Sequence, residues 1–220
     1  MRDLLPQIEA WLADGRQVAL ATVIRTWGSS PRPAGAQMAV SQEGEIAGSV
    51  SGGCVEGAVT AAALEVLAGG EPRQLHFGVS DDTAWSVGLA CGGEIDVFVQ
   101  RFDPAWLPLL RAALQQSIRF ALLINLTSGE WQLWQEGDRG APPPPESGEH
   151  TLAGERVFVN WVAPPPKLIV VGGVHIAIPL VTMAKAAGFY TVVIDPRRAF
   201  GRSERFPQAD EVLTSWPRQA

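Results

Sequence analysis

The two cysteines of this 220-residue chain both lie in glycine-rich turns. Cys54 belongs to G-S-V-S-G-G-C-V-E-G at Gly48–Gly57, and Cys91 belongs to G-L-A-C-G-G-E at Gly88–Glu94. Glycine tolerates positive φ and has no Cβ, so such turns bring the backbone and a neighbouring thiol close to a ligand. Most free cysteines are buried as small apolar side chains. Both cysteines here lie instead in glycine-rich turns, and this repetition points to thiols held for chemistry.

The residues after Cys54 predict a helix. Val55–Leu67 is rich in alanine, leucine and valine, and Gly69–Gly70 follows as a C-terminal cap. If the helix begins near Ser51–Cys54, its free N–H groups and positive dipole end favour a Cys54 thiolate and attract an anion such as phosphate. The alternative interpretation is that Cys54 is a small apolar side chain packed in a tight loop.

A third polar loop lies upstream, in R-T-W-G-S-S-P-R-P-A-G at Arg25–Gly35. Its prolines and glycines are typical of a loop. Ser29, Ser30 and Arg32 place two hydroxyls and a guanidinium there, and arginine offers a planar fork of donors to an anion or a polar ring. The alternative is a surface loop whose serines cap their own turns.

The elements that must position these loops follow from hydrophobic periodicity and turn signals. Residues 136–149 include four consecutive prolines and are expected to form a loop. The strand that ends at Ser49 runs directly into the Cys54 turn, so we expect the three loops at one edge of a sheet. We expect helices over 3–14 and 104–116, and strands over 17–24, 36–41, 45–49, 73–77, 94–102, 120–126, 131–134 and 156–162.

A proline-rich segment at 164–166 predicts a stiff linker between two domains. We place an N-terminal domain over 1–163 and a second domain over 164–220. The fold class is therefore expected to be α/β, with a mixed N-terminal domain followed by an incomplete Rossmann-like βαβ domain. Only about 25 residues follow Asp195, which is too few for a doubly wound sheet.

The second domain opens with a dinucleotide-type pattern. A strand at Lys167–Val171 leads through a glycine turn and a helix to a second strand that ends at Asp195. In G-G-V-H-I-A the first glycine is Gly172, but Val174 occupies the place where glycine lets the backbone approach the pyrophosphate. The pattern therefore supports the fold more strongly than a bound dinucleotide.

The composition excludes several classes of protein. No apolar run approaches the ~18 residues of a membrane span, and the N-terminus lacks the apolar core of a signal peptide. A formal net charge of −6 disfavours nucleic acid as a main partner. Two cysteines are too few for a disulfide scaffold, which suits a reducing cytoplasm. We expect a cytoplasmic protein that binds neither nucleic acid nor membrane.

The motifs together resemble one family. G-S-S-P-R at Gly28–Arg32, the two Cys–Gly–Gly turns, and G-G-V-H-I-A followed by D-P-R are similar to the xanthine dehydrogenase accessory factor family, XdhC/CoxI. The resemblance implies a chaperone that binds the molybdenum cofactor, a molybdopterin. Such a chaperone helps the sulfuration of the cofactor together with a cysteine desulfurase, and passes it to a xanthine dehydrogenase-type molybdenum hydroxylase.

The resemblance also implies a set of site residues. Cys54 and Cys91 become candidates for holding molybdenum or relaying sulfur, and His175 fits the family's histidine in the glycine turn. We expect the two thiols to lie near each other on loops that line one cleft. The candidate cofactor-binding residues are Ser29, Ser30, Arg32, Gly52, Gly53, Glu56, Gly92, Gly93, Gly172, His175 and Asp195.

Two other functions stay open on the residues alone. An NAD(P)-dependent oxidoreductase would use Gly172 and Asp195, although Val174 and the lack of an obvious acid or base for hydride transfer count against it. A catalytically silent binding scaffold would make both cysteines structural. We favour an accessory factor over a catalyst, and expect a homodimer because an incomplete parallel sheet leaves an edge to cover.

Overall fold

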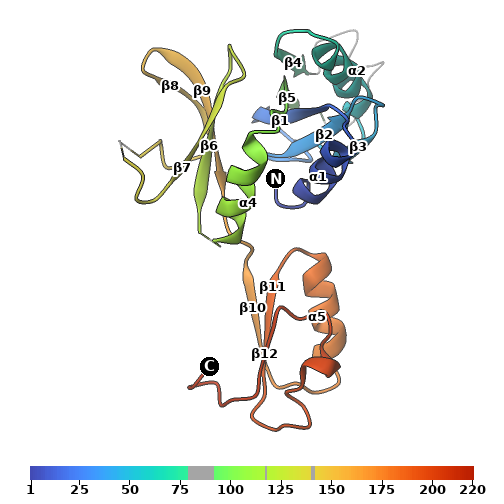
Figure 1. The fold of residues 1–220 in the computed structure, drawn as a ribbon, viewed down its shortest axis with the longest axis vertical. Helices are drawn as coiled ribbons and strands as arrows, with labels where there is room; N and C mark the ends of the chain where they lie inside the picture. Colours follow the sequence, from blue (N-terminus) through green and yellow to red (C-terminus); the bar gives the residue numbers. More distant parts are fainter. Residues whose placement is uncertain (79–91, 117, 140–141) are drawn as a thin grey trace. The chain divides into compact units, whose positions relative to one another are not determined.

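The computed structural model describes residues 1–78, 92–116, 118–139 and 142–220. Its chain divides into two compact units, Met1–Ala163 and Pro164–Ala220 (Figure 1). Both units combine helices with sheets, so the predicted α/β class is confirmed. Cys91 lies outside the described residues. Within these residues, no helix has both the length and the apolar character that crossing a membrane requires.

The first unit is built on a five-stranded antiparallel sheet with the strand order β3-β2-β1-β5-β4. The first seven residues of β1 are all buried, which explains why this strand reads as a nearly continuous apolar run. The edge strands are shorter and more exposed. The five strands are β1 (Val18–Trp27), β2 (Gln37–Ser41), β3 (Ile46–Gly48), β4 (Arg73–Phe77) and β5 (Glu94–Arg101).

Helices cover this sheet on both faces. Helix α2 (Glu56–Leu67) packs its Val59, Ala63 and Val66 against alternate residues of β1, β2 and β5. Helices α1 (Leu5–Ala13) and α4 (Trp106–Gln115) form a second apolar cluster with the opposite face of β1. Successive side chains along a strand point to opposite faces of the sheet, so they belong to two separate apolar clusters.

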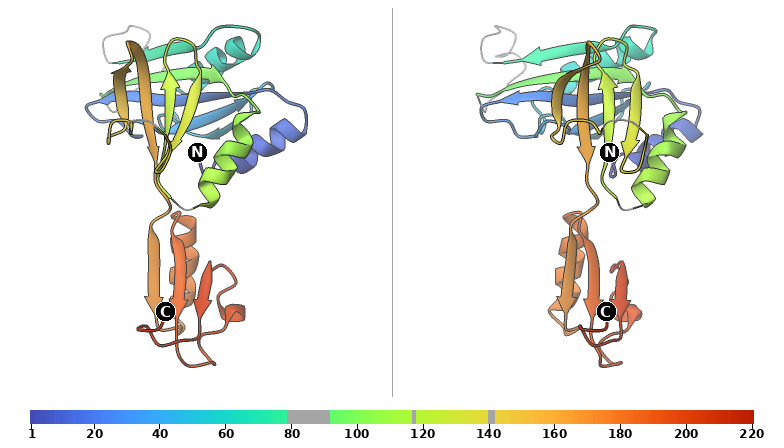
Figure 2. Two further views of the ribbon diagram at one scale, coloured as in Figure 1. Left: turned by 60° about the vertical axis from the view of Figure 1, so that its left-hand side comes forward. Right: turned by 90° about the vertical axis from the view of Figure 1, so that its left-hand side faces the viewer.

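A second antiparallel sheet, in the order β7-β6-β9-β8, completes the first unit. Figure 2 shows its strands crossing those of the five-stranded sheet. Ile24 and Phe98 of the first sheet pack with Ile124 and Phe158 of the second, so both sheets share one core. The four strands are β6 (Phe120–Asn125), β7 (Trp131–Gln135), β8 (Gly148–Leu152) and β9 (Glu155–Val162).

Two strands differ from the sequence prediction. Strand β8 begins within the proline-rich segment predicted as loop, because an edge strand that pairs with β9 needs no apolar pattern of its own. Strand β1 continues through Trp27, whereas the sequence predicts a loop throughout Arg25–Gly35. A bulge between Val23 and Arg25 lets this extension stay paired with β5.

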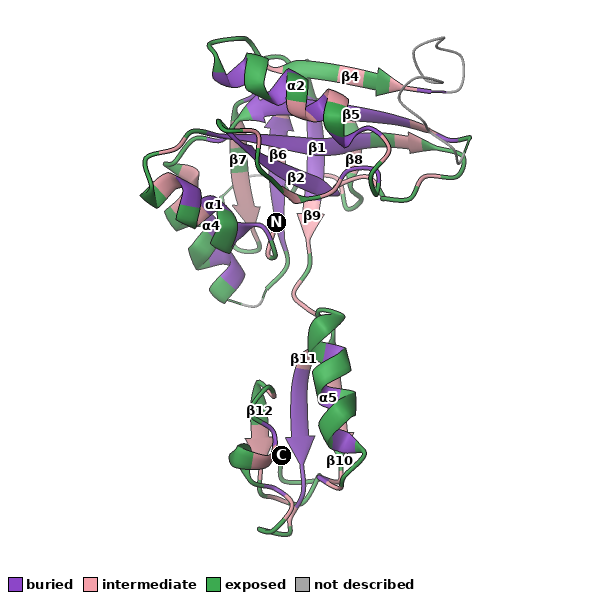
Figure 3. Cartoon of the chain, turned by 90° about the vertical axis from the view of Figure 1, so that its right-hand side faces the viewer, coloured by how far each residue is buried: buried purple, intermediate pink, exposed green. Residues whose placement is uncertain are grey.

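The second unit is a parallel three-stranded sheet with the order β10-β11-β12. Helix α5 (Ala177–Ala186) connects the first two strands and buries Ala177 and Val181 against Val193. Figure 3 shows the buried β11 and the exposed outer side of α5. This is the Rossmann-like βαβ arrangement that the glycine turn predicts. The strands are β10 (Lys167–Val171), β11 (Tyr190–Ile194) and β12 (Glu211–Leu213), with a 3-10 turn at Ser203–Arg205 before β12.

Candidate functional site

The turn that carries Cys54 is organised by the carboxylate of Glu56. This side chain is 8% exposed and folds back into the turn between β3 and α2. Six donors converge on its two oxygens: the Ser49 Oγ at 2.7 Å, the Ser51 hydroxyl, and the backbone N–H groups of Val50 (3.2 Å), Ser51 (2.9 Å), Gly52 (3.1 Å) and Gly53 (2.9 Å).

Ser51 extends this network to the start of the helix. Its hydroxyl donates to Glu56 and accepts hydrogen bonds from the N–H groups of Cys54 and Val55, each at 3.0 Å. Gly52 and Gly53 have φ values of +80° and +116°, which turn successive N–H groups toward one point. The turn is therefore closed entirely by its own residues.

Hydrogen bonding dominates the charge state of Glu56. Burial raises the pKa of this carboxyl, but the hydroxyls of Ser51 and Ser49 and the backbone N–H groups outweigh that effect and lower the pKa to about 2. The side chain is therefore ionised at neutral pH. A buried anion that accepts this many hydrogen bonds fixes the shape of the turn.

This geometry corrects the predicted start of the helix. The sequence suggests a helix that begins near Ser51–Cys54 with free N–H groups, whereas α2 begins at Glu56. The N–H groups of residues 50–53 bind the Glu56 carboxylate, and those of Cys54 and Val55 bind the Ser51 hydroxyl. The protein's own carboxylate thus occupies the place that the sequence suggests for an external phosphate.

Cys54 combines features of both sequence interpretations. Its thiol is free, and the residue is partly buried against the apolar cluster beneath α2. It is also partly exposed, so a ligand can reach it. Within the described ranges, no three histidine, cysteine or acidic side chains are arranged to hold a metal ion. In that part of the chain Cys54 offers one soft ligand rather than a closed metal site.

The loop at 28–32 lies against both glycine-rich turns. A Cβ built on Gly52 would lie 3.7 Å from the Cβ of Pro31. A Cβ on Gly93 would collide with the Ser29 carbonyl and lie 2.9 Å from the Trp27 carbonyl oxygen. Glycine at 93 therefore allows two backbones to approach closely. The structure brings these three segments of the sequence together.

The polar side chains of the 28–32 loop have different environments. The Ser30 hydroxyl donates to the Arg32 carbonyl at 2.8 Å, which is the self-capped turn of the alternative interpretation. Ser29 and Arg32 are exposed. Gly92 is exposed and has a φ of +69°, whereas Gly93 is buried. The predicted closeness of Cys54 to Cys91 stays a prediction, because Cys91 lies outside the described residues.

A cross-strand cluster that the sequence analysis missed lies at the ends of three neighbouring strands. Asp96 is 4% exposed on β5, between Arg25 on β1 and His76 on β4. Arg25 Nε donates to one carboxylate oxygen at 2.6 Å, and His76 Nδ1 lies 2.6 Å from the other. The hydrogen bond to Asp96 raises the pKa of Arg25. The carboxylate thus holds two exposed basic side chains beside the loop that begins at Gly28.

One signal in the sequence points to this cluster. Asp96 interrupts an otherwise buried strand, and a buried acid requires partners. The identity of its partners depends on the strand register, which places Asp96 opposite both Arg25 and His76. No local pattern in the sequence specifies that register.

In the second unit, Asp195 is held by Arg197 of its own loop and by the glycine turn after β10. The carboxylate is fully buried and accepts hydrogen bonds from the Gly173 N–H at 2.9 Å and the Arg197 N–H at 2.9 Å. The Arg197 guanidinium binds both oxygens, with distances of 2.9 and 2.7 Å. These hydrogen bonds, the guanidinium's foremost, lower the pKa of Asp195 despite its burial. In this structure the carboxylate holds the glycine turn and Arg197, and its contact with a cofactor stays a prediction.

The glycine turn before α5 presents different groups to solvent. Gly172 has a φ of +107° and lines a cavity of about 420 Å³ together with Asp195 and Trp216. Gly173 is buried against the backbone of Phe200. His175 is exposed two residues before α5 begins at Ala177.

Models of known protein families match both units of the chain. A family model described as the XdhC and CoxI family matches residues 11–78, and one described as the XdhC Rossmann domain matches residues 168–219. A crystal structure described as a xanthine dehydrogenase from Bacillus halodurans aligns with a TM-score of 0.76 and 29% identity. The alignment covers 98% of this chain and 69% of that one.

Two relatives carry informative names. A probable xanthine dehydrogenase subunit from Bacillus subtilis is 29% identical over 231 aligned positions, which cover 96% of this chain and 69% of that protein. The molybdenum cofactor insertion chaperone PaoD from Escherichia coli is 38% identical over 100 residues, which cover 45% of this chain and 30% of that protein. The chain therefore spans about two thirds of the first relative and less than a third of the second.

Proposed function

Because this chain belongs to the XdhC and CoxI family, we propose that it is an accessory factor that holds molybdenum cofactor for insertion into a xanthine dehydrogenase-type molybdenum hydroxylase. The name of the PaoD relative describes insertion of that cofactor, and the names of both Bacillus relatives refer to xanthine dehydrogenase. These names support an accessory role and a molybdenum hydroxylase as the partner.

The observation that carries the proposal is the fixed presentation of Cys54. The Glu56 carboxylate gathers the preceding backbone N–H groups, and Ser51 holds the N–H of Cys54 itself. The partly exposed thiol therefore occupies a defined position without support from a ligand. Molybdenum carried on sulfur ligands is a soft centre, and a thiolate is a matching ligand. Among the described residues, Cys54 provides the thiol that can coordinate the molybdenum.

The phosphate of the cofactor requires another partner than the turn amides, because Glu56 already binds them. We assign it to Arg32 and Ser29, which are both exposed on the 28–32 loop. Arg32 follows Pro31, which packs against Gly52 in the Cys54 turn. The exposed glycines at 52, 53 and 92 then permit close approach of the cofactor, whereas the buried Gly93 lets the 28–32 loop lie beside them. Glu56 acts as a positioning residue.

The sulfuration step gives Cys54 a second role. A cysteine desulfurase carries its sulfur as a cysteine persulfide. In the proposed transfer, the Cys54 thiolate attacks the terminal persulfide sulfur, the S–S bond breaks, and the desulfurase cysteine leaves as a thiolate. Cys54 then carries the persulfide, and no net oxidation occurs. Cys91 is proposed to share the roles of metal ligand and sulfur relay.

The second unit is proposed to mediate assembly and to contribute to binding. Ile169 and Val171 of β10 are 57% and 63% exposed, and covering them favours a homodimer. Gly172 and the exposed His175 are proposed to contact cofactor, with Asp195 shaping their turn. A free thiol at Cys54 suits a reducing compartment such as the cytoplasm.

Activation of a molybdenum hydroxylase that lacks its cofactor tests this function. The wild-type chain and Cys54→Ser are each mixed anaerobically with cofactor, a cysteine desulfurase and the apo-hydroxylase. The wild type should restore hydroxylase activity, and the serine variant should restore several-fold less. Equal activation by both proteins would contradict a role for Cys54, and no activation by the wild type would contradict the proposed function.

A further inference from the structure

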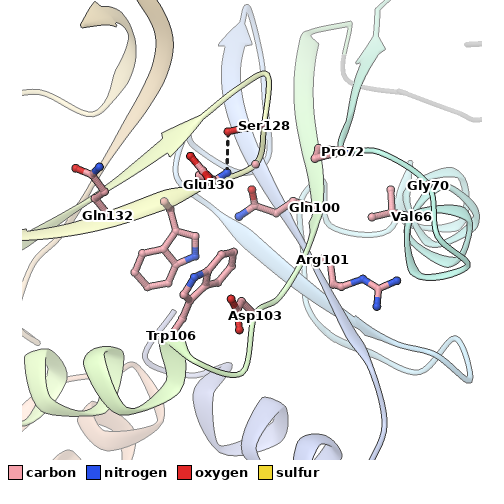
Figure 4. Close-up of a pocket in the computed structure, with 12 residues that line it drawn as sticks. Val66, Gly70, Pro72, Gln100, Arg101, Asp103, Trp106, Ser128, Glu130 and Gln132 are labelled. Atoms are coloured by element: carbon pink, nitrogen blue, oxygen red, sulfur yellow. Dashed lines mark hydrogen bonds between the residues drawn. The ribbon is translucent and has the colours of Figure 1, made fainter. Parts of the chain in front are cut away.

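A cavity of about 460 Å³ lies in the first unit between the five-stranded sheet and the turn from β6 to β7 (Figure 4). Its walls come from β5, the start of α4, the segment after α2, and the β6–β7 turn. No residue of the 28–32 loop or of the Cys54 turn lines it. Its size falls within the range of small-molecule sites.

Gln100 marks this cavity as a binding site. The side chain is 2% exposed, yet neither its amide nitrogen nor its amide oxygen has a hydrogen-bond partner within the described part of the chain. An unpaired buried polar group destabilises the folded chain, and the great majority of buried amides are satisfied. In Figure 4 the amide extends from β5 toward Glu130 and Trp106. A donor and an acceptor therefore face the cavity together.

The surrounding backbone holds the amide in place. Gly129 in the β6–β7 turn has a φ of +76°, and a Cβ there would lie 2.8 Å from Pro72 Cγ and 3.3 Å from Gln100 Oε1. The turn itself is fixed by a hydrogen bond from the Glu130 N–H to the Ser128 hydroxyl at 3.2 Å. The unpaired amide is thus a feature of a packed site rather than of a loose surface.

The other walls define the shape of a ligand. The indoles of Trp106 and Trp131 lie with their ring centroids 4.5 Å apart, and both are partly exposed at the cavity. Such indoles stack on flat aromatic rings. Asp103 and Glu130 add carboxylates, which accept hydrogen bonds from N–H groups. The site therefore suits a planar ring with several N–H donors.

We propose that this cavity binds a fused heterocycle with a 2-amino-4-oxopyrimidine edge, which guanine and pterin rings share. The ring C=O and N–H pair with the two ends of the Gln100 amide, the 2-amino group reaches a carboxylate, and the ring plane stacks on indole. Adenine can also pair with both ends of a glutamine amide, through its amino group and a ring nitrogen, but it has no second amino group for the carboxylate, so it satisfies fewer of these groups. The proposal that the cavity binds guanine is independent of the proposed function, whereas the proposal that it binds pterin rests on that function.

Calorimetric titration of the full chain tests the proposal. The probes are guanosine, 6-hydroxymethylpterin and adenosine, and the variants are Gln100→Met and the exposed control Gln116→Met. At least one of the first two probes should bind, at least tenfold more tightly than adenosine. Gln100→Met should weaken that binding at least tenfold, while Gln116→Met leaves it unchanged.

The stability of the variant separates a binding role from a structural one. Gln100→Met removes two unpaired polar atoms at similar volume, so its thermal midpoint should equal or exceed that of the wild type. Wild-type protein that binds neither ring, equal binding of adenosine, or unchanged binding by Gln100→Met would each overturn the proposal. Cys54→Ser should leave guanosine binding intact, so failure of the cofactor proposal is detected separately from failure of this one.

Discussion

The N–H of Gly53 donates a hydrogen bond to the Glu56 carboxylate at 2.9 Å, so the Cys54 turn is closed by the first residue of the following helix. In many glycine-rich turns that precede a helix, the converging N–H groups bind an external anion. Here they bind an internal one. The turn is therefore set for Cys54 before any cofactor arrives, and this preorganisation leads to the first two predictions.

Glu56→Gln should destabilise the first unit by about 2–4 kcal/mol, because hydrogen bonds to a buried charge are strong and the new NH2 group faces existing donors. Denaturant unfolding measures the loss. The control Glu71→Gln alters an exposed carboxylate and should change the free energy of unfolding by less than about 0.5 kcal/mol. Equal effects of the two substitutions would contradict the role of Glu56 in the turn.

The same carboxylate predicts a pH dependence. Its pKa is about 2 in the folded chain and near 4.5 in the unfolded chain, so the unfolded state binds more protons between these values. The stabilisation is complete above about pH 4.5 and is lost as the pH falls toward 2. The free energy of unfolding of Glu56→Gln should therefore fall less steeply across this window than that of the wild type. Parallel pH dependences of the two free energies of unfolding would show that the charge of Glu56 does not contribute to folding stability.

Two glycines should respond in opposite ways to alanine. Gly93→Ala forces a Cβ into the Ser29 and Trp27 carbonyls, so we expect a loss of more than about 2 kcal/mol. Gly57 lies in α2 with nothing within 4 Å of a built Cβ, and Gly57→Ala should stabilise by about 0.5–1 kcal/mol. Thermal unfolding compares the two. A tolerated alanine at position 93 would be inconsistent with the close approach of the two loops.

Asp96→Asn should destabilise the first unit by about 2–4 kcal/mol, because the substitution removes the buried charge that holds Arg25 and His76. Asp14→Asn serves as the control, since the Asp14 side chain is 63% exposed. Denaturant titration at neutral pH measures both. A loss below about 0.5 kcal/mol for Asp96→Asn would show that the cluster contributes little to folding.

The sequence predicts most elements of this fold and the grouping of the chemically interesting loops. Periodicity locates α1, α2 and β4 within a few residues, because each has a clear apolar face or clear flanking turns. It misses β8, an edge strand whose side chains carry no apolar alternation. Long-range pairing also escapes it, because only the register of β1, β4 and β5 reveals the partners of Asp96.

The candidate site is predicted from the sequence only in part. Glycine patterns identify the Cys54 turn, and the structure places the 28–32 loop against it. The function of Glu56 is not predictable from spacing, since a glutamate at the start of a helix reads equally well as an exposed residue. Gln100 is likewise hidden within an apolar strand, because its significance depends on the lack of a partner across the described tertiary structure.

The most direct test of the central claim is the amount of cofactor retained by the thiol variant. The wild type and Cys54→Ser are purified anaerobically after exposure to molybdenum cofactor, and molybdenum and pterin are measured per chain, with the thermal midpoint as a check on folding. The account predicts cofactor on the wild type, several-fold less on Cys54→Ser, and similar midpoints, because a hydroxyl stays protonated where a thiolate coordinates. Full retention of molybdenum and pterin by the folded serine variant would contradict the claim that Cys54 holds the cofactor.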